Sequence, residues 1–439
     1  MHKSPNSDLY LSDNHIGTDY EFIPAGINSI SEVFMLKGKN ILIGVTGSIA
    51  AYKAAHLTSL LKKQGCNIDV VMTENACQFI TPLVFETLTG NRCPHDTFEK
   101  REVFDVEHIS LAKKADLVIV APASANVIAK LAGGIADDML TTTLLACTAP
   151  KLIAPAMNSA MYLNPVTQKN IEKLEALEYD IIDPNNGLLA CGDIGPGKMA
   201  EPEIIVEFAL KYLAMKKDLS GKKVLVTAGP TRESIDPVRF ISNHSSGKMG
   251  FALAKAAMLR GADVTLITGK TSCTPPMFVN TIYVENTQSM CDAVIGEFDT
   301  SDFVFKAAAV SDYTPLQTAE NKIKKKDSDM AIPLKRTPDI LMELGKKKKN
   351  SQFICGFSME TEDLIKNSSA KLKKKNADMI VANNLKDDGA GFGTDTNIIT
   401  IITEDDAKRL PIMNKFDAAN TIIDTALELN KSKNKEREV

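Results

Sequence analysis

Short apolar runs alternate with segments of helical periodicity along most of the chain. In the N-terminal half, Val- and Ile-rich runs occupy residues 40–45, 68–73, 116–122, 151–157 and 179–183. Apolar runs of this length are typical of strands that are buried on both faces of a parallel sheet. Between the runs, apolar residues recur on one helical face, as at Ala50, Ala54, Leu57 and Leu61. The pattern therefore predicts an α/β fold with helices on both faces of a parallel sheet.

The C-terminal half repeats this alternation. Its apolar runs occupy residues 224–226, 264–268, 281–285, 302–310, 353–358 and 378–383. The half ends differently, because residues 397–403 and 409–413 flank the polar segment EDDAK and predict an antiparallel hairpin at the sheet edge. A final amphipathic helix follows, with Phe416, Ile422 and Ile423 on one face. We therefore expect two doubly wound, three-layer αβα domains.

The length of 439 residues exceeds what one hydrophobic core usually organises. We assign residues 37–217 and 218–439 to two domains, preceded by a polar leader, residues 1–36, that we expect to be disordered. The formal net charge of −4 gives no indication of a nucleic-acid partner. No apolar run is long enough to span a bilayer, so we expect no membrane partner. The eight cysteines show no CxxC pair or zinc-site spacing, which favours a reduced, cytoplasmic protein.

Small and polar residues follow the strands of the first predicted sheet. Because parallel strands end at one edge of a sheet, Gly47, Ser48, Thr73, Ser124 and Asn126 should converge there. The glycine spacing differs from the GxGxxG motif of dinucleotide folds and from the GxxxxGK[ST] motif of NTPases. A short Gly-Ser turn before a helix instead suits a single phosphate, such as the phosphate of FMN.

A second candidate phosphate site lies in residues 224–250, which read VLVTAGPTRESIDPVRFISNHSSGKMG. An apolar strand is followed by a polar loop and then by the start of a helical pattern. Gly229 and Gly247 permit a positive φ or a close backbone approach. Residues 245–247 lead into the helix, where unpaired N–H groups attract phosphate. The sequence therefore predicts two phosphate-binding crevices in one polypeptide.

Several longer motifs define a resemblance. In the N-terminal half they are TGSIAAYK, VIVAPASAN, PAMNSAMY and ACGDIGPGKM, and in the C-terminal half AGPTRESIDPVRFISNHSSGKMG, AAVSDY and KIKK. With these motifs the chain resembles the bacterial bifunctional phosphopantothenoylcysteine decarboxylases/phosphopantothenate–cysteine ligases from residue 38 to about residue 430. The resemblance implies a flavodoxin-like flavoprotein of the Cys-decarboxylase type, followed by a Rossmann-like ligase domain.

The resemblance also implies two consecutive steps of coenzyme A synthesis. CTP would activate the carboxylate of 4′-phosphopantothenate as an acyl-cytidylate, and free cysteine would then displace CMP. FMN-dependent decarboxylation of phosphopantothenoylcysteine would follow and yield 4′-phosphopantetheine. The implied cofactors are FMN and Mg²⁺, with CTP as a co-substrate.

In the decarboxylase half, the resemblance assigns roles to His108 and Cys191, and the Met-Asn end of a predicted strand adds Asn158 as a candidate. His108 matches the histidine that acts on the substrate carboxylate or thiol. Cys191, in the glycine-rich segment 187–197, matches the acid that protonates the enethiol, and we expect that segment to form a mobile flap. Asn158 is suited to hold a carboxylate or amide through two hydrogen bonds, with turn capping as the alternative.

In the ligase half, Arg239 is expected to bind phosphopantothenate and Asn243 to stabilise the acyl-cytidylate. Lys322 matches the essential lysine near the reacting phosphate. Asp312 matches a nucleotide contact and is also a candidate Mg²⁺ ligand. Lys306 departs from the apolar strand pattern and, if it points inward, must pair or lie near phosphate. Further residues that match nucleotide contacts are Ala308, Ala309, Pro338, Asp339, Ile340, Leu341, Phe357, Lys371 and Lys375.

Two other functions stay open on the residues alone. The first is a different FMN-binding enzyme of the Cys-decarboxylase or prenyltransferase type, which the complete ligase half disfavours. The second is a non-catalytic, flavin-binding regulatory protein, which the retained reacting groups disfavour. The resemblance further implies a homo-oligomer in which flavin-domain trimers and ligase-domain dimers combine into a dodecamer.

Overall fold

The computed structural model describes residues 35–98, 106–189, 192–325, 329–360, 362–384 and 394–438, with side chains to residue 433. Apart from Met35 and Leu36, the predicted leader lies outside these residues, and so does Cys191. Leu36 is fully buried, and its N–H donates a hydrogen bond to the carbonyl of Gln64 (3.1 Å). The end of the predicted leader therefore packs into the first core.

The first sheet has five parallel strands. They are β1 (Asn40–Val45), β2 (Asn67–Met72), β3 (Leu117–Ala123), β4 (Lys151–Pro155) and β5 (Tyr179–Ile181). Their order is β2-β1-β3-β4-β5, and every pairing is parallel. This is the strand order of flavodoxin-like sheets, which confirms the fold class predicted for the first half. Alternation along β1 places Ile41 and Ile43 in one apolar cluster and Leu42 in another, on opposite faces of the sheet.

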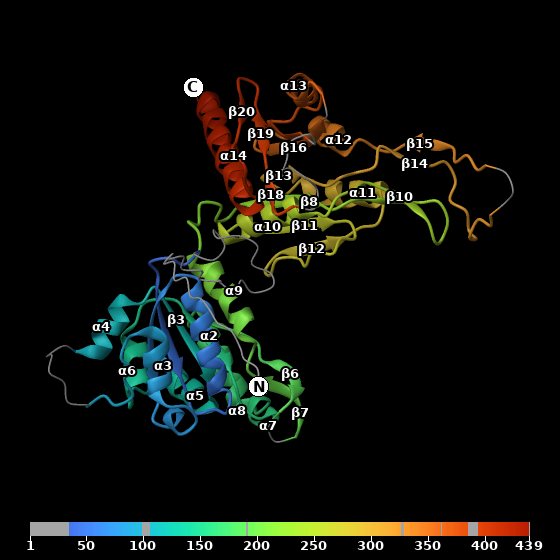
Figure 1. Ribbon diagram of the computed structural model, residues 1–439. Coiled ribbons are helices and arrows are strands. Elements are labelled where there is room, and N and C mark those ends of the chain that lie inside the picture. The colour runs from blue at the N-terminus through green and yellow to red at the C-terminus, as the bar shows by residue number, and fades with distance from the viewer. Residues whose placement is uncertain are drawn as a thin grey trace, which may run out of the picture.

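Helices cover both faces of this sheet (Figure 1). On one face α2 packs against α3 and α9, and on the other α5 packs against α6 and α8. Ala54, Leu57 and Leu61 of α2 are buried, as the helical spacing predicts. The helices are α2 (Ala51–Lys63), the 3₁₀ turn η1 (Ala76–Gln78), α3 (Pro82–Thr89), α4 (Glu107–Lys114), α5 (Ala125–Gly133), α6 (Met139–Ala146), α7 (Ser159–Tyr162), α8 (Pro165–Ala176) and α9 (Pro202–Leu213).

An antiparallel hairpin of β6 (Asn185–Leu188) and β7 (Ile194–Lys198) follows the first sheet. The sequence predicts this segment as a glycine-rich flap, and the structure adds that its two sides are paired strands. Gly197 adopts φ +129, and a Cβ there would lie 2.3 Å from the carbonyl oxygen of Met157. Glycine is therefore required where the hairpin approaches the chain after β4.

The second sheet has six parallel strands and two antiparallel edge strands. They are β8 (Lys223–Ala228), β11 (Asp263–Thr268), β12 (Asn280–Tyr283), β13 (Phe303–Lys306), β16 (Phe353–Glu360), β17 (Met379–Asn384), β19 (Ile399–Ile402) and β20 (Ala407–Arg409). The sheet order is β12-β11-β8-β13-β16-β17-β19-β20. Numbered along the chain, the parallel part reads 3-2-1-4-5-6, the Rossmann order, so the predicted fold class and edge hairpin are confirmed. The second hairpin strand was expected at 409–413 but lies earlier, because Pro411 has no N–H to donate to a ladder.

Five helices accompany this sheet within the described ranges: α10 (Lys248–Leu259), α11 (Thr287–Phe298), α12 (Ile340–Lys347), α13 (Leu364–Lys374) and α14 (Lys415–Glu438). Three short two-stranded ribbons are β9 (Arg232–Ser234) with β10 (Phe240–Ser242), β14 (Tyr313–Pro315) with β15 (Leu334–Arg336), and β18 (Thr396–Asn397) with β21 (Met413–Asn414). We call the β9–β10 and β14–β15 ribbons and their connecting loops the arm. Figure 1 shows the arm extending sideways from the second sheet.

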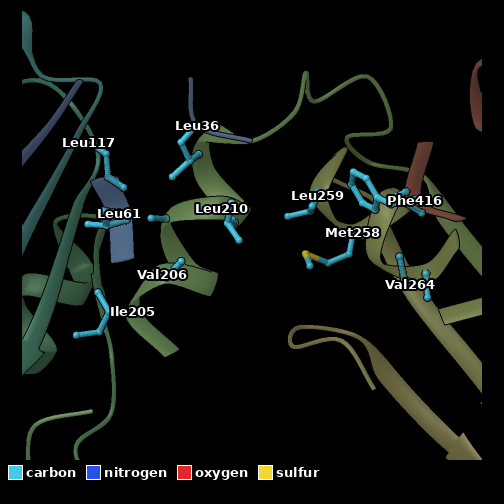
Figure 2. Packing of buried hydrophobic residues seen from close by; sticks show 14 of the residues in the cluster. Leu36, Leu61, Leu117, Ile205, Val206, Leu210, Met258, Leu259, Val264 and Phe416 are labelled. Atoms are coloured by element: carbon cyan, nitrogen blue, oxygen red, sulfur yellow. The ribbon is translucent and has the colours of Figure 1, made fainter. Parts of the chain in front are cut away.

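The two halves share one apolar cluster. It includes Leu61 and Leu210 from the first half and Met258 from the second (Figure 2). Phe208 of α9 packs edge-on against Phe278, with ring centroids 4.7 Å apart. Helix α9 therefore joins the halves through buried apolar contacts. Within the described ranges, every helix is too short or too polar to cross a membrane.

Candidate functional site

A cavity of about 770 Å³ opens at the first sheet, where the strand order reverses between β1 and β3. Ligands of doubly wound folds bind at such reversals. All five residues predicted to bind FMN line this cavity, which we call the first cavity: Gly47, Ser48, Thr73, Ser124 and Asn126. The structure therefore brings together the residues that the sequence pattern groups.

The rim of the first cavity is fixed by local hydrogen bonds. The Thr46 hydroxyl donates to the carbonyl of Pro122 (2.7 Å) and accepts from the N–H of Ser124 (2.9 Å), so the loops after β1 and β3 are tied together. A Cβ at Gly47 would lie 2.7 Å from the Cβ of Asn75. This position thus excludes any side chain and leaves the backbone open to a ligand, as a phosphate-binding turn requires.

Asn158 caps α7 and also lines the first cavity. Its Oδ1 accepts from the N–H of Ala160 (2.8 Å), and its Nδ2 donates to Asp193 in the β6–β7 hairpin (3.0 Å). The capping role that was the alternative for Asn158 is therefore present, in a residue that also faces the cavity. Cys191 falls between β6 and β7 in the sequence and lies outside the described residues.

The first cavity combines balanced charges with apolar walls. Its charged lining residues are Lys53, Lys130, Lys198, Glu74, Asp137 and Asp138. Apolar groups include Met157, Met161 and Leu188. Lys53 is buried and donates to the carbonyl of Met199 (3.2 Å) and to Glu201 (2.8 Å). No sequence motif contains Lys53 as a predicted site residue, although an isolated lysine on the apolar face of α2 is itself a signal.

His108 does not line the first cavity. It lies half-buried in the first turn of α4, on the opposite side of the first half from the β6–β7 hairpin (Figure 1). Within one copy of the chain, His108 therefore lies apart from the first cavity and from the predicted FMN-binding residues that line it.

A second cavity of about 590 Å³ opens where the order of the second sheet reverses between β8 and β13. The first turn of α10 and the loop after β13 both contribute to it. Asp312 and Asn243 line it with all the other predicted nucleotide contacts except Lys322: Ala308, Ala309, Pro338, Asp339, Ile340, Leu341, Phe357, Lys371 and Lys375. We call it the second cavity.

Gly247 shapes the helix end that faces the second cavity. It has φ +79, and a Cβ there would lie 3.0 Å from the Cγ2 of Thr271 and 3.2 Å from the nitrogen of Gly229. Its left-handed conformation starts α10 without a capping side chain. A helix N-terminus that lines the cavity in this way favours an anion there.

A hydrogen-bond network holds the loop after β13. The Asn243 amide donates to the carbonyls of Ala309 and Val310 (both 3.2 Å). The N–H of Ala308 donates to the hydroxyl of Thr227 (3.1 Å). Asn243 therefore fixes the loop that precedes Asp312, in addition to lining the cavity.

The buried side chain of Glu233 anchors the same loop from the arm. One carboxylate oxygen accepts both the N–H and the hydroxyl of Thr287, at 2.8 Å each. Thr287 is bonded to Thr231 (3.1 Å), and the Thr231 hydroxyl accepts from the N–H of Ser311 (3.0 Å). Glu233 could not be predicted from sequence, since its partner Thr287 is distant along the chain and no local pattern joins the two residues.

The second cavity is cationic. Its described lining contains five lysines, which are Lys248, Lys306, Lys371, Lys375 and Lys415, against two aspartates, Asp312 and Asp339. Burial lowers the pKa of Lys371 and of Lys375. This excess of positive charge suits a polyanion.

Arg239 and Lys322 lie on the arm and do not line the second cavity. The Arg239 guanidinium pairs with the buried Asp236 (2.7 Å) and donates to the carbonyl of Ile323. Asp236 also accepts the N–H groups of Val238 (2.8 Å), Arg239 (2.8 Å) and Ile323 (3.1 Å). Although burial opposes it, these hydrogen bonds lower the pKa of Asp236 to about 2. Lys322 is exposed beside this network.

The described part of the chain holds no group of three or more His, Cys, Asp or Glu residues arranged to bind a metal ion. Asp312 therefore offers a single carboxylate at the second cavity. Such a site fits Mg²⁺ that is held mainly by substrate phosphates, because Mg²⁺ commonly takes one or two protein carboxylates.

Sequence comparisons decide the family. A family model described as "Flavoprotein" matches residues 29–214, and one described as "DNA/pantothenate metabolism flavoprotein C-terminal domain" matches residues 219–429. The chain is 51% identical over 401 residues to the coenzyme A biosynthesis bifunctional protein CoaBC of Bacillus subtilis (strain 168), covering 90% of this chain and 98% of that protein. The chain belongs to this family. The CoaBC protein of Haemophilus influenzae is 42% identical over 393 residues, covering 90% and 98%.

The predicted resemblance is thereby confirmed. The chain is a bifunctional coenzyme A biosynthesis enzyme with a decarboxylase half, which is a flavoprotein, and a ligase half. A cysteine/cysteine sulfinic acid decarboxylase from an unidentified prokaryotic organism is also 46% identical over 356 residues, covering 80% of this chain and 99% of that protein. The matches over both halves weigh against the two alternative functions considered from sequence.

Proposed function

We propose that the second cavity binds CTP and ligates cysteine to 4′-phosphopantothenate, and that the first cavity binds FMN and decarboxylates the resulting phosphopantothenoylcysteine to 4′-phosphopantetheine. The observation that carries this proposal is the pair of cavities at the two strand-order reversals. Each cavity is lined by the residues predicted for its ligand, apart from Lys322 at the second cavity. We expect a cytoplasmic enzyme, since the cysteines follow no disulfide pattern.

In the ligase reaction, a carboxylate oxygen of 4′-phosphopantothenate attacks the α-phosphorus of CTP, and pyrophosphate leaves. The cysteine amine then attacks the acyl carbon, loses a proton, and CMP leaves. Both steps move negative charge, and the lysines of the second cavity offset it. Asp312 would hold Mg²⁺ beside the phosphates, and Asn243 would stabilise the acyl-cytidylate.

The first cavity fits FMN because Gly47 leaves no room for a side chain and opens backbone to a phosphate. When bound, FMN supplies two-electron oxidation and reduction to the cysteine portion of the substrate. Asn158 is placed to hold the substrate carboxylate while it keeps the hairpin attached through Asp193. Cys191, which falls between β6 and β7 in the sequence, would donate a proton to the enethiol as the product thiol forms.

We propose that a second copy of the chain completes each site. His108 lies away from the first cavity, and Arg239 and Lys322 lie away from the second. The arm exposes apolar residues, and so does the first half: Val238, Phe240, Tyr313, Leu316 and Leu334 on the arm, and Tyr52, Leu83, Leu145 and Val166 on the first half. A three-fold contact between first halves and a two-fold contact between arms, as the resemblance implies, would cover such residues and close into a dodecamer.

The test is to incubate the purified protein with 4′-phosphopantothenate, cysteine, CTP and Mg²⁺. We expect CMP, pyrophosphate and carbon dioxide in equal amounts, with 4′-phosphopantetheine as the product. Cys191→Ser should still release carbon dioxide but accumulate the enethiol. Carbon dioxide from free cysteine alone, without CMP release, would instead support the activity for which the cysteine/cysteine sulfinic acid decarboxylase is named.

A further inference from the structure

Lys306 is the last residue of β13, beside the strand-order reversal of the second sheet. It pairs in register with Thr227 of β8 on one side and with Gly356 of β16 on the other. The three residues before it, Phe303 to Phe305, are buried in apolar clusters. Lys306 is half-buried and lines the second cavity, so the end of β13 contributes a lysine to the cavity wall.

The other lysines of the second cavity have protein partners. Lys371 donates to the carbonyl of Phe357 (2.9 Å), Lys375 pairs with Asp339, Lys248 pairs with Asp395 (2.6 Å), and Lys415 donates to the carbonyl of Thr394. In contrast, the Lys306 ammonium has no hydrogen-bond partner or ion pair in the ranges that the structure describes. A partly buried ammonium without a partner is costly, so a ligand anion is the partner that the site lacks.

The surroundings of Lys306 disfavour its charged form. Burial, followed by the neighbouring charge of Lys371, lowers the pKa of Lys306 to about 8, although Asp312 opposes the shift. Asp312 is thus near enough to interact but is not hydrogen-bonded to the lysine. A bound anion would favour the charged ammonium and raise this pKa again.

We propose that Lys306 is a nucleotide-binding residue whose ammonium pairs with a phosphate oxygen of the nucleoside triphosphate. This inference rests on the proposed nucleotide function of the second cavity. It adds a charged phosphate contact at the end of β13 to the cavity that the first turn of α10 also lines. A purely structural lysine would instead need an acceptor within the protein.

The test is titration calorimetry of CTP with Mg²⁺ at pH 8, in buffers of different ionisation enthalpy. Because this pH lies near the pKa of Lys306, part of the Lys306 side chains in the free protein are uncharged, and binding should take up a fraction of a proton. Lys306→Met should lose that proton uptake and bind CTP about tenfold more weakly. Lys306→Arg should recover affinity but take up no proton, because a guanidinium is always charged.

Lys408→Met, on the exposed β20 strand, is the matched control and should behave as the unmodified protein. Decarboxylation of phosphopantothenoylcysteine supplied directly verifies that each variant is folded. Equal CTP affinity and equal proton uptake in Lys306→Met and the unmodified protein would overturn this inference alone. No CTP binding by the unmodified, flavin-loaded protein would overturn the proposed nucleotide function and this inference together.

Discussion

The two cavities occupy equivalent places in two related sheets, yet they differ in charge. The first has three lysines and three carboxylates in its described lining, together with apolar walls. The second has five lysines and two carboxylates. An uncharged ring system with one phosphate suits the first, and a triphosphate suits the second. The shared strand plan therefore places the ligand, and the loops after the strands select it.

The loops differ in length as well. Residues 46–50 join β1 to α2 directly, and Gly47 packs against Asn75. Residues 229–247 join β8 to α10 and contain the β9–β10 ribbon of the arm. The long loop brings Glu233 and Asn243 to the nucleotide side of the sheet. A short loop thus builds a rigid phosphate turn, whereas a long loop adds a scaffold for a multistep reaction.

The largest expected effect comes from a substitution that disables the first cavity and leaves the second cavity active. Gly47→Val would force a side chain against Asn75, so we expect flavin affinity to fall about 100-fold, or about 2.8 kcal/mol. Decarboxylation should fail while CTP-dependent ligation continues, as bound-flavin absorbance and CMP release would measure. Gly133→Ala is the control, because its nearest non-local atom would be 3.6 Å away. A yellow Gly47→Val protein with normal flavin content would contradict this account of the first cavity.

The second prediction concerns the scaffold of the second cavity. Glu233→Ala leaves the buried N–H of Thr287 without its acceptor, at a cost of about 1–3 kcal/mol, while the Thr287 hydroxyl can still donate to the carbonyl of Ser311 (3.2 Å). We expect ligation to slow about tenfold, mainly through a raised KM for CTP, with normal decarboxylation of supplied phosphopantothenoylcysteine. Glu233→Gln keeps an acceptor oxygen and should recover most activity. Glu404→Ala, on the exposed turn between β19 and β20, is the control. Equal KM values in all four proteins would exclude a positioning role for Glu233.

The third prediction concerns the pH dependence of the arm. The pKa of Asp236 is about 2 in the folded protein, against about 3.9 for an unfolded aspartate. Its stabilising contribution is therefore complete above about pH 4 and is lost as the pH falls toward about 2. Asp236→Asn should lower the urea midpoint at pH 7, and the difference from the unmodified protein should shrink below pH 4. A difference that stays constant down to pH 3 would show that hydrogen-bond geometry, not charge, matters at this position.

The smallest expected effect is that of salt, which tests the difference in charge between the two cavities. Raising the salt concentration from about 0.1 M to about 0.5 M should weaken CTP binding severalfold, because the cationic second cavity attracts its ligand by charge. Flavin retention should change little, since the first cavity is charge-balanced. Both quantities can be followed on one sample by calorimetry and absorbance. Equal salt dependence of the two ligands would mean that the lysines of the second cavity are neutralised within the protein.

The sheets could be predicted from sequence because buried parallel strands are continuous apolar runs, as in β1 and β8. The convergence of Gly47 with Ser124 followed from the rule that ligands bind where parallel strands end, whereas the grouping of Asp312 with Lys371 came from the family resemblance. Ribbons such as β6–β7 were not predicted as strands, because their Gly- and Pro-rich sequences show no alternation. The Glu233–Thr287 contact joins segments that are distant in sequence, and no local sequence pattern predicts it.

The apolar cluster shared by the halves has a consequence for cooperativity. Leu210 of α9 and Met258 of α10 belong to the same cluster, and Phe208 and Phe278 pack across the junction. If the fragments separated after cleavage of the backbone between α9 and β8, each would expose an apolar face to water. The fragments would therefore stay associated, and heating the intact chain should melt both halves as a single calorimetric unit.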